Sequence, residues 1–275
     1  MKIQESIQMN NGRAIPVLGV GLWQVSREDA ARVVKEGIEL GYRHIDDAAA
    51  YRNEEEAGEG IRLSGIAREE LFVTTKIPAE FKSYEKAKQS IDDSLKRLGL
   101  DYIDLILIHA PRPWPLMWTN INYDKQNVAV YKAMEETLQA GKVRAIGVSN
   151  FSEHDIENIL KNCQVKPAVN QICVFAGNTP KNLIEFCKKN DIVVEAYSPL
   201  GTGKVMKNDK LKEMAAKYGV SLPQLAIAYT LQLGCVSLPK TTHKEYLAAN
   251  KEVDFVISEE DMEALLQMGI RQKAI

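Results

Sequence analysis

The sequence has few cysteines, few aromatic residues and no long apolar run. Four cysteines occur in 275 residues, without a Cys-x-x-Cys pair or the spacing of a zinc site; they are Cys163, Cys173, Cys187 and Cys235. We interpret them as small buried residues of a reduced protein. No stretch approaches the roughly 20 apolar residues of a membrane helix, and the start, MKIQESIQMN, lacks the apolar core of a signal peptide. These absences predict a cytoplasmic protein without a membrane segment.

An excess of either charge is also missing, because 35 lysines and arginines face 37 aspartates and glutamates, for a formal net charge of -2. This balance argues against nucleic acid as the main partner. No His-Glu-x-x-His or similar metal spacing is present, so no metal site is expected. The composition, 45% hydrophobic and 26% charged, is that of an ordinary globular protein with ample chain to bury a core.

What the chain does contain is a repeated alternation of short apolar runs and amphipathic stretches. The runs are 18–22, the segment ending at Asp46, 71–77, 101–110, 143–150, 168–174, 191–198 and 235–240. About eight such units in this length predict an α/β fold, a (β/α)8 TIM barrel formed by residues 1–275 as a single domain. A doubly wound sheet is the runner-up, disfavoured because no Gly-x-Gly-x-x-Gly follows an early strand.

Turn and cap signals refine this prediction. Asn10-Asn11-Gly12 separates two strand-like segments and predicts an N-terminal β-hairpin. Three helix starts are expected, with caps at Ser26, Ser152 and Thr179. An extra C-terminal helix should follow Ser258.

Polar and ionisable residues end almost every apolar run. In a barrel, the C-terminal ends of the strands carry function, and the residues there are Asp46, Lys76, His109, Ser149, Asn150, Gln171, Tyr197, Ser198 and Lys240, with Tyr51 just past the second strand. Each residue alone is unremarkable because polar residues begin loops. The convergence of Asp, Lys, His and Tyr on one rim is informative.

The chemistry of these side chains can be argued directly. A lysine at the end of a buried strand needs a counter-ion, which Asp46 can supply to Lys76. A tyrosine near that ammonium should have a lowered pKa and deliver a proton near neutral pH. His109 can hydrogen-bond a substrate carbonyl. Such a set delivers a proton to a developing alkoxide, and a hydride from a bound cofactor would complete the reaction.

Several motifs resemble the aldo-keto reductases over essentially the whole chain. They are GYRHIDDAAAYRNEEEAG (41–58), TTK (74–76), DLILIH (104–109), GVSNF (147–151), VNQ (169–171), AYSPLG (196–201) and LPKT (238–241). Among the family, short bacterial members such as the 2,5-diketo-D-gluconate reductases look most similar. The resemblance implies NAD(P)H-dependent reduction of aldehydes or ketones to alcohols by a monomeric enzyme acting on small carbonyl substrates.

The resemblance also implies roles for individual residues. It implies a catalytic tetrad of Asp46, Tyr51, Lys76 and His109, with Tyr51 as the general acid. It puts Ser149, Asn150 and Gln171 against the nicotinamide amide, with Tyr197 stacked on the ring. It puts Ser198 and Leu200 along the pyrophosphate, and Lys240, Thr241 and Asn250 at the adenosine end.

Two departures from the family pattern bear on cofactor and substrate. Tyr246 stands where an arginine often grips the 2′-phosphate of NADPH, and Ala249 replaces a usual glutamate. We still expect NADPH, with NADH or dual use as the rival. Ala110 stands where many members have a tryptophan, so the substrate pocket should be wider there unless Trp114 or Trp118 fills the space. Trp23 should form the opposite wall.

Other polar residues receive structural interpretations. We expect Asp47 to face the helical layer, His44 to be structural, and the glutamates that begin at Glu54 to be solvated at a helix start. Two other functions stay open: a cofactor-binding barrel with little turnover, and a metal-dependent barrel hydrolase that uses Asp46, Asp47 and His109.

Overall fold

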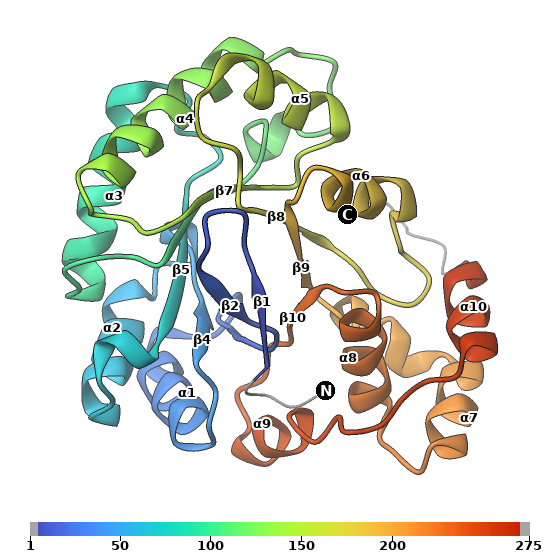
Figure 1. Ribbon diagram of the computed structural model, residues 1–275. Helices are drawn as coiled ribbons and strands as arrows, with labels where there is room; N and C mark the ends of the chain where they lie inside the picture. The colour runs from blue at the N-terminus through green and yellow to red at the C-terminus, as the bar shows by residue number, and fades with distance from the viewer. Residues whose placement is uncertain (1–4, 270–275) are drawn as a thin grey trace.

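The computed structural model describes residues 5–269 and contains a sheet of eight parallel strands (Figure 1). The strands are β3 (Val20–Gly21), β4 (His44–Asp46), β5 (Phe72–Ile77), β6 (Leu105–Ile108), β7 (Ile146–Ser149), β8 (Val169–Cys173), β9 (Val193–Tyr197) and β10 (Val236–Leu238). Each pairs with its sequence neighbour, and almost all their residues are buried, as expected for strands covered on both faces.

The two ends of this sheet meet, which closes the barrel. The backbone N–H of Gly19, just before β3, donates to Ser237 O on β10 at 3.0 Å, and Ser237 N donates to Val17 O at 2.8 Å. Leu18 and Ser237 form a parallel bridge at the same seam. The predicted (β/α)8 TIM barrel is therefore confirmed.

Helices surround the barrel in chain order (Figure 1). They are α1 (Arg27–Glu39), α2 (Glu54–Ser64), α3 (Tyr84–Leu98), α4 (Asp124–Gln139), α5 (Glu153–Asn162), α6 (Lys181–Lys189), α7 (Asp209–Lys217), α8 (Leu222–Gln232), α9 (Lys244–Asn250) and the extra C-terminal helix α10 (Glu259–Gln267). Within residues 5–269, no helix is both long and apolar enough to cross a membrane.

Two of the three expected helix caps are present. Ser26 accepts a hydrogen bond from the Asp29 N–H at the start of α1, and Ser152 forms a capping box with Asp155 at the start of α5. The predicted cap at Thr179 is wrong, because α6 begins at Lys181 without a side-chain cap. The Thr179 hydroxyl instead contacts the Tyr229 hydroxyl at 2.7 Å.

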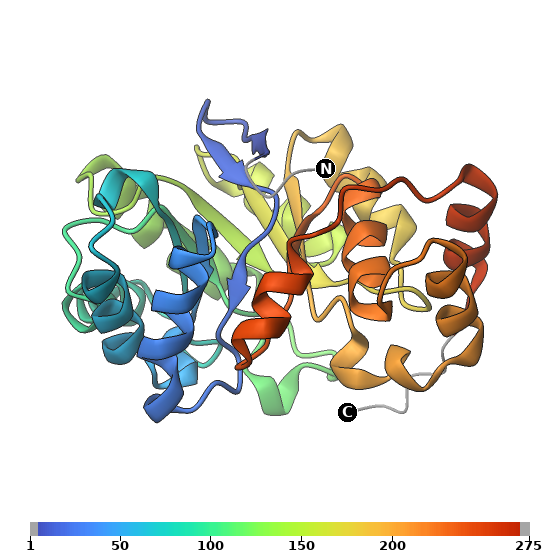
Figure 2. The same cartoon turned by 90° about the horizontal axis from the view of Figure 1, so that it is seen from below.

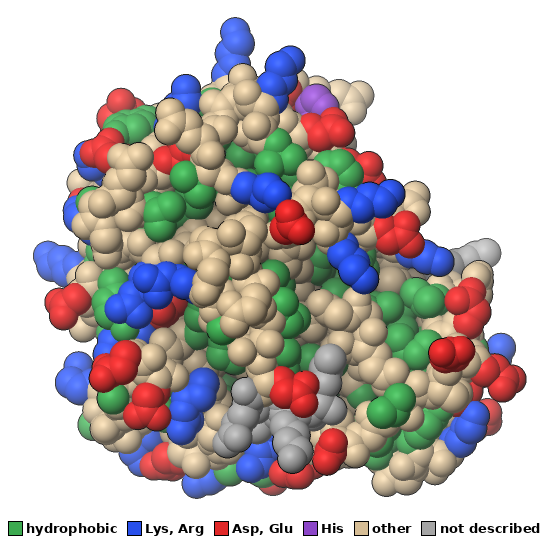
Figure 3. All heavy atoms as spheres, viewed as in Figure 1, with side chains coloured by type: hydrophobic (Ala, Val, Ile, Leu, Met, Phe, Trp, Pro, Cys, Tyr) green, Lys and Arg blue, Asp and Glu red, His purple; other side chains and the backbone are tan. Residues whose placement is uncertain are grey.

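The predicted N-terminal hairpin covers one end of the barrel. Its strands, β1 (Ser6–Gln8) and β2 (Ala14–Pro16), are antiparallel. Met9 and Ile15 pack against residues at the starts of the barrel strands, including Phe72 and Leu105. Viewed as in Figure 1, from the hairpin end, side chains and backbone fill the centre of the barrel (Figure 3). The perpendicular view shows the hairpin at one end of the barrel and the green segment after β6 at the other end (Figure 2). Function is therefore expected at the uncovered end, where the strands finish.

Candidate active site

An ion pair between Lys76 and Asp46 lies at the C-terminal ends of β5 and β4. The Lys76 Nζ donates to both Asp46 carboxylate oxygens, at 2.8 and 2.9 Å, and to the backbone carbonyl of Asp47 at 2.8 Å. Lys76 is fully buried and Asp46 is nearly so. Burial lowers the pKa of Lys76, but Asp46, Tyr51 and Glu195 together outweigh it and raise the pKa above its usual value, so the ammonium stays charged.

Tyr51 comes to this ion pair from a short 3-10 helix, η1 (Ala49–Tyr51), that follows β4. Its hydroxyl lies 3.5 Å from the Lys76 Nζ, which also stands 5.2 Å from the centre of the Tyr51 ring. The expected lowering of the Tyr51 pKa is wrong for this structure. Burial raises the pKa of Tyr51 to about 12, and Lys76 acts in the opposite direction without prevailing. Tyr51 therefore carries its proton at neutral pH.

His109 follows β6 and completes the expected set of four. Its ring centre lies 5.6 Å from that of Tyr51 and 5.2 Å from that of Trp114, both edge-on. Burial, helped by Lys76, lowers the pKa of His109 to about 3, so the imidazole is neutral. Its Nδ1 is buried without a hydrogen-bond partner. A neutral imidazole has one N–H to donate, which suits a carbonyl oxygen as its acceptor.

A second cluster of polar side chains lies beside His109 at the ends of β7 and β9. Asn150 Nδ2 donates to the His109 backbone carbonyl at 3.1 Å and to Ser149 Oγ at 3.0 Å. The Tyr197 hydroxyl donates to Asn150 Oδ1 at 2.8 Å. Asn150 and Ser198 both have positive φ, at 59° and 51°. Non-glycine residues rarely adopt this conformation, and such strain often marks a functional site.

Gln171 links the tetrad to the barrel interior. Its Nε2 donates to Asp46 Oδ1 at 2.8 Å and to Glu195 Oε2 at 2.9 Å. Sequence reasoning missed Glu195, although a signal existed. Glu195 precedes Tyr197 by two residues on one strand, so both side chains face the barrel interior.

The residues expected at the adenosine end lie in the loop after β10 and on α9. Lys240 is exposed, Thr241 Oγ1 accepts from the His243 N–H, and Asn250 is buried. Leu200 is half-buried in the loop after β9. Tyr246, 56% exposed, has its ring 5.1 Å from that of His243.

The expected substrate walls lie at the same rim. Ala110 is buried, whereas Trp23 and Trp114 are 43% and 41% exposed. Trp114 stands beside His109, while Trp118 is 84% exposed. Of the two tryptophans considered for the space at Ala110, Trp114 is therefore the one next to the tetrad.

The expectation that the glutamates at the start of α2 are solvated is wrong for Glu54. Its side chain is buried, accepts from Thr75 Oγ1 at 2.6 Å and pairs with Arg97 at 2.7 Å. Of the next two glutamates, Glu55 is exposed and Glu56 is half-buried, and both pair with Arg27. Among the described residues 5–269, no group of His, Cys, Asp and Glu side chains could hold a metal ion.

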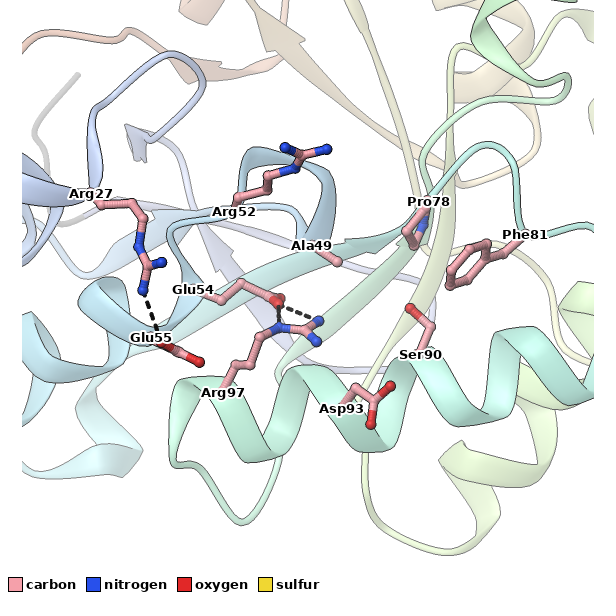
Figure 4. Close-up of a pocket in the computed structure, with 10 residues that line it drawn as sticks. All are labelled: Arg27, Ala49, Arg52, Glu54, Glu55, Pro78, Phe81, Ser90, Asp93 and Arg97. Atoms are coloured by element: carbon pink, nitrogen blue, oxygen red, sulfur yellow. Dashed lines mark hydrogen bonds and ion pairs between the residues drawn. The ribbon is translucent and has the colours of Figure 1, made fainter.

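A pocket of about 360 Å³ lies between η1 and α3 (Figure 4). Its charged lining residues include Glu54, Glu55 and Arg97, which are engaged in ion pairs with one another or with Arg27. Tyr51, Lys76 and His109 are absent from its lining. The tetrad, and not this pocket, is the candidate active site.

Comparisons with known proteins identify the family of the chain. The sequence model of the Aldo/keto reductase family matches residues 17–269. A glyoxal reductase of Bacillus subtilis is 40% identical over 265 residues, covering 96% of this chain and 92% of its own.

Two solved structures extend the comparison. An aldo-keto reductase from a deep-sea metagenome library superposes with a TM-score of 0.90 at 37% identity, over 98% of this chain and 97% of its own. A Bombyx mori aldo-keto reductase in complex with NADP superposes with a TM-score of 0.86 at 35% identity, over 96% of this chain and 92% of the Bombyx mori chain. The chain therefore belongs to the aldo/keto reductase family of oxidoreductases.

Proposed function

We propose that this protein reduces small aldehydes or ketones to alcohols with NADPH, and that Tyr51 is the general acid. The observation that carries the proposal is the buried Lys76 ammonium, which Asp46 holds in place 3.5 Å from the Tyr51 hydroxyl. The bound cofactor supplies a hydride to the carbonyl carbon. The protein's own task is then to place the carbonyl and to deliver a proton to its oxygen.

Proton delivery follows from the charges in the tetrad. Tyr51 is protonated at neutral pH, since a phenol ordinarily has a pKa near 10 and burial raises that of Tyr51 to about 12. When it gives up that proton, the phenolate forms next to a fixed cation, which stabilises the negative charge. The neutral His109 can donate a hydrogen bond to the same carbonyl oxygen and so orient it between the two side chains.

The second cluster suits a nicotinamide. Both N–H groups of Gln171 are engaged by Asp46 and Glu195, which leaves its Oε1 to accept from a carboxamide. Ser149 and Asn150 supply further polar atoms, and the Tyr197 ring stands next to them. We assign the nicotinamide end of the cofactor to these residues, and the pyrophosphate path to Ser198 and Leu200.

NADPH is preferred over NADH on the basis of cations near the adenosine end. Lys240 is exposed and forms no ion pair within 4 Å among the described residues, although its charge helps to lower the pKa of Asp29. Lys244, in contrast, lies 3.8 Å from Glu39. Tyr246 cannot pair with a phosphate charge, so we assign the 2′-phosphate to Lys240, beside Thr241 and Asn250.

The substrate class is proposed from the tetrad and its walls. Trp23 and Trp114 offer aromatic surface, and the small Ala110 leaves space beside His109. We propose α-dicarbonyls and keto sugars, because the sequence motifs lead us to expect a similarity to 2,5-diketo-D-gluconate reductases and because one relative is a glyoxal reductase.

Initial rates with NADPH and NADH against α-dicarbonyls, keto sugars and aromatic aldehydes test this function. We expect turnover of at least one α-dicarbonyl and a higher kcat/KM with NADPH than with NADH. Cofactor binding by fluorescence without turnover of any substrate would contradict the proposal and favour a cofactor-binding barrel without catalysis.

A further inference from the structure

Glu195 is a fully buried carboxylic acid to which the reaction scheme above gives no role. It lies in the middle of β9, two residues before Tyr197, so its side chain points into the barrel one layer below that ring. Its register partners are Gln171 on β8 and Val236 on β10. A carboxyl group in such a place is costly unless it is bonded or neutral.

The bond that Glu195 makes fixes the orientation of Gln171. The Gln171 Nε2 carries two hydrogens, and it donates to Glu195 Oε2 at 2.9 Å and to Asp46 Oδ1 at 2.8 Å. Glu195 and Asp46 therefore occupy both N–H groups and prevent the amide from flipping. Glu195 thus helps to hold Asp46, the counter-ion of Lys76, and to turn the Gln171 oxygen toward the proposed nicotinamide position.

The charges around Glu195 favour its neutral form. The titratable groups facing it are Asp46 and His44 from β4 and Lys76 from β5, while Gln171 and Val236 are neutral. His44, at 3.5 Å, is neutral near pH 7 because burial lowers its pKa to about 4. The Lys76 charge is already matched by Asp46. A second carboxylate would therefore stand in the barrel without a cation, and burial next to Asp46 raises the pKa of Glu195 to about 8.

We propose that Glu195 is a positioning residue that fixes the Gln171 amide and that, by losing its proton at alkaline pH, slows proton transfer from Tyr51. An ionised Glu195 adds a negative charge next to Asp46 and Lys76. It therefore opposes the phenolate that Tyr51 must form during turnover. This inference rests on the proposed function, because it requires Tyr51 to donate a proton.

Two variants separate positioning from titration. Glu195→Gln is neutral at every pH and keeps an oxygen that can accept from Gln171. Glu195→Met is also neutral, but it removes the acceptor and releases the amide. Glu135→Gln is the matched control, because Glu135 is a buried glutamate on α4 that accepts from the backbone N–H groups of Gln164 and Val165.

The experiment is kcat against pH from 6 to 10 with saturating NADPH, together with the cofactor Kd by fluorescence. We expect the wild-type kcat to fall above about pH 8, and the same fall in Glu135→Gln. Both Glu195 variants should lack this fall. Only Glu195→Met should weaken cofactor binding, by about tenfold at all pH values.

Either of two results would overturn the inference: a wild-type kcat that stays constant to pH 10, or a wild-type alkaline fall retained in both Glu195 variants. The proposed function fails in a different measurement, since full activity of Tyr51→Phe would remove Tyr51 as the proton donor. The two failures are therefore distinguished by different variants.

Discussion

Asp46 and Asp47 are neighbours in the chain, but their carboxyl groups face different surroundings. Asp46 holds the Lys76 ammonium with both oxygens. Asp47 offers Lys76 only its backbone carbonyl, while its own Oδ1 accepts from the Ala48 N–H and its Oδ2 is buried without a partner. The alternation of side chains along a strand predicted this separation. It did not predict that Asp47 would be fully buried.

We expect Asp46→Asn to lower kcat by about a hundredfold or more, because Lys76 loses its counter-ion and its hold beside Tyr51. Asp47→Thr should keep kcat within about threefold, since the Lys76 contact uses the backbone and a threonine hydroxyl can replace the bond to Ala48. Steady-state kinetics of the two variants checks this pair. Equal losses in both would contradict the assignment of the catalytic carboxylate to Asp46.

The burial of the Asp47 carboxyl group also predicts that the stability of the fold depends on pH. Burial, together with the nearby Glu54, raises the pKa of Asp47 well above its usual value. Above about pH 4 the unfolded chain releases this proton while the folded protein keeps it, so Asp47 costs stability as the pH rises. Relative to wild type, Asp47→Asn should therefore gain up to about 1.4 kcal/mol of unfolding free energy per pH unit above pH 4. Denaturant titrations at pH 5 and 7 test this, and a pH-independent difference would contradict it.

Among the elements, α2 and α3 make an unusually close contact at Gly58. A Cβ at this position would overlap the backbone carbonyl of Leu98, the last residue of α3. The same packing brings Glu54, at the start of α2, against Arg97. A sequence pattern of three glutamates predicts a helix start, but it contains no information on which neighbouring helix buries the first one. For this reason the burial of Glu54 was not predicted.

Gly58→Ala should lower the free energy of unfolding by about 2 kcal/mol or more, despite the higher helix propensity of alanine. The reason is that the Leu98 backbone cannot easily move away from the added methyl group. Gly269→Ala is the matched control, since a Cβ there meets no atom of residues 5–269 within 4 Å. Denaturant unfolding of both variants measures the effect. An unchanged or increased stability in Gly58→Ala would show that the two helices are not so closely packed.

For the whole molecule, the sequence predicted the barrel and the pairing of Asp46 with Lys76, because both depend on strand periodicity and on where each strand ends. The pKa of Tyr51 could not be predicted in this way. It depends on the balance between burial and the Lys76 charge, which only the packed rim determines. The hydrogen bond from Gln171 to Glu195 likewise joins two strands, and the pattern within each strand does not say which side chains meet across them.

We further propose that the chain folds as one domain. A closed barrel has no free sheet edge along which one part could separate, so unfolding should be a single cooperative transition. Tryptophan fluorescence reports the rim through Trp23 and Trp114, and circular dichroism reports the helices. The two signals should give the same midpoint in denaturant. Separate midpoints would contradict a single domain.

The central claim is that Tyr51 donates the proton during carbonyl reduction. The most direct test is Tyr51→Phe, with kcat measured by NADPH oxidation and the NADPH Kd measured by fluorescence in the same preparation. We predict a loss of kcat of about 10³-fold or more, with a Kd within about threefold of wild type, because the ring remains and only the donated proton is removed. A kcat close to that of wild type would contradict the claim.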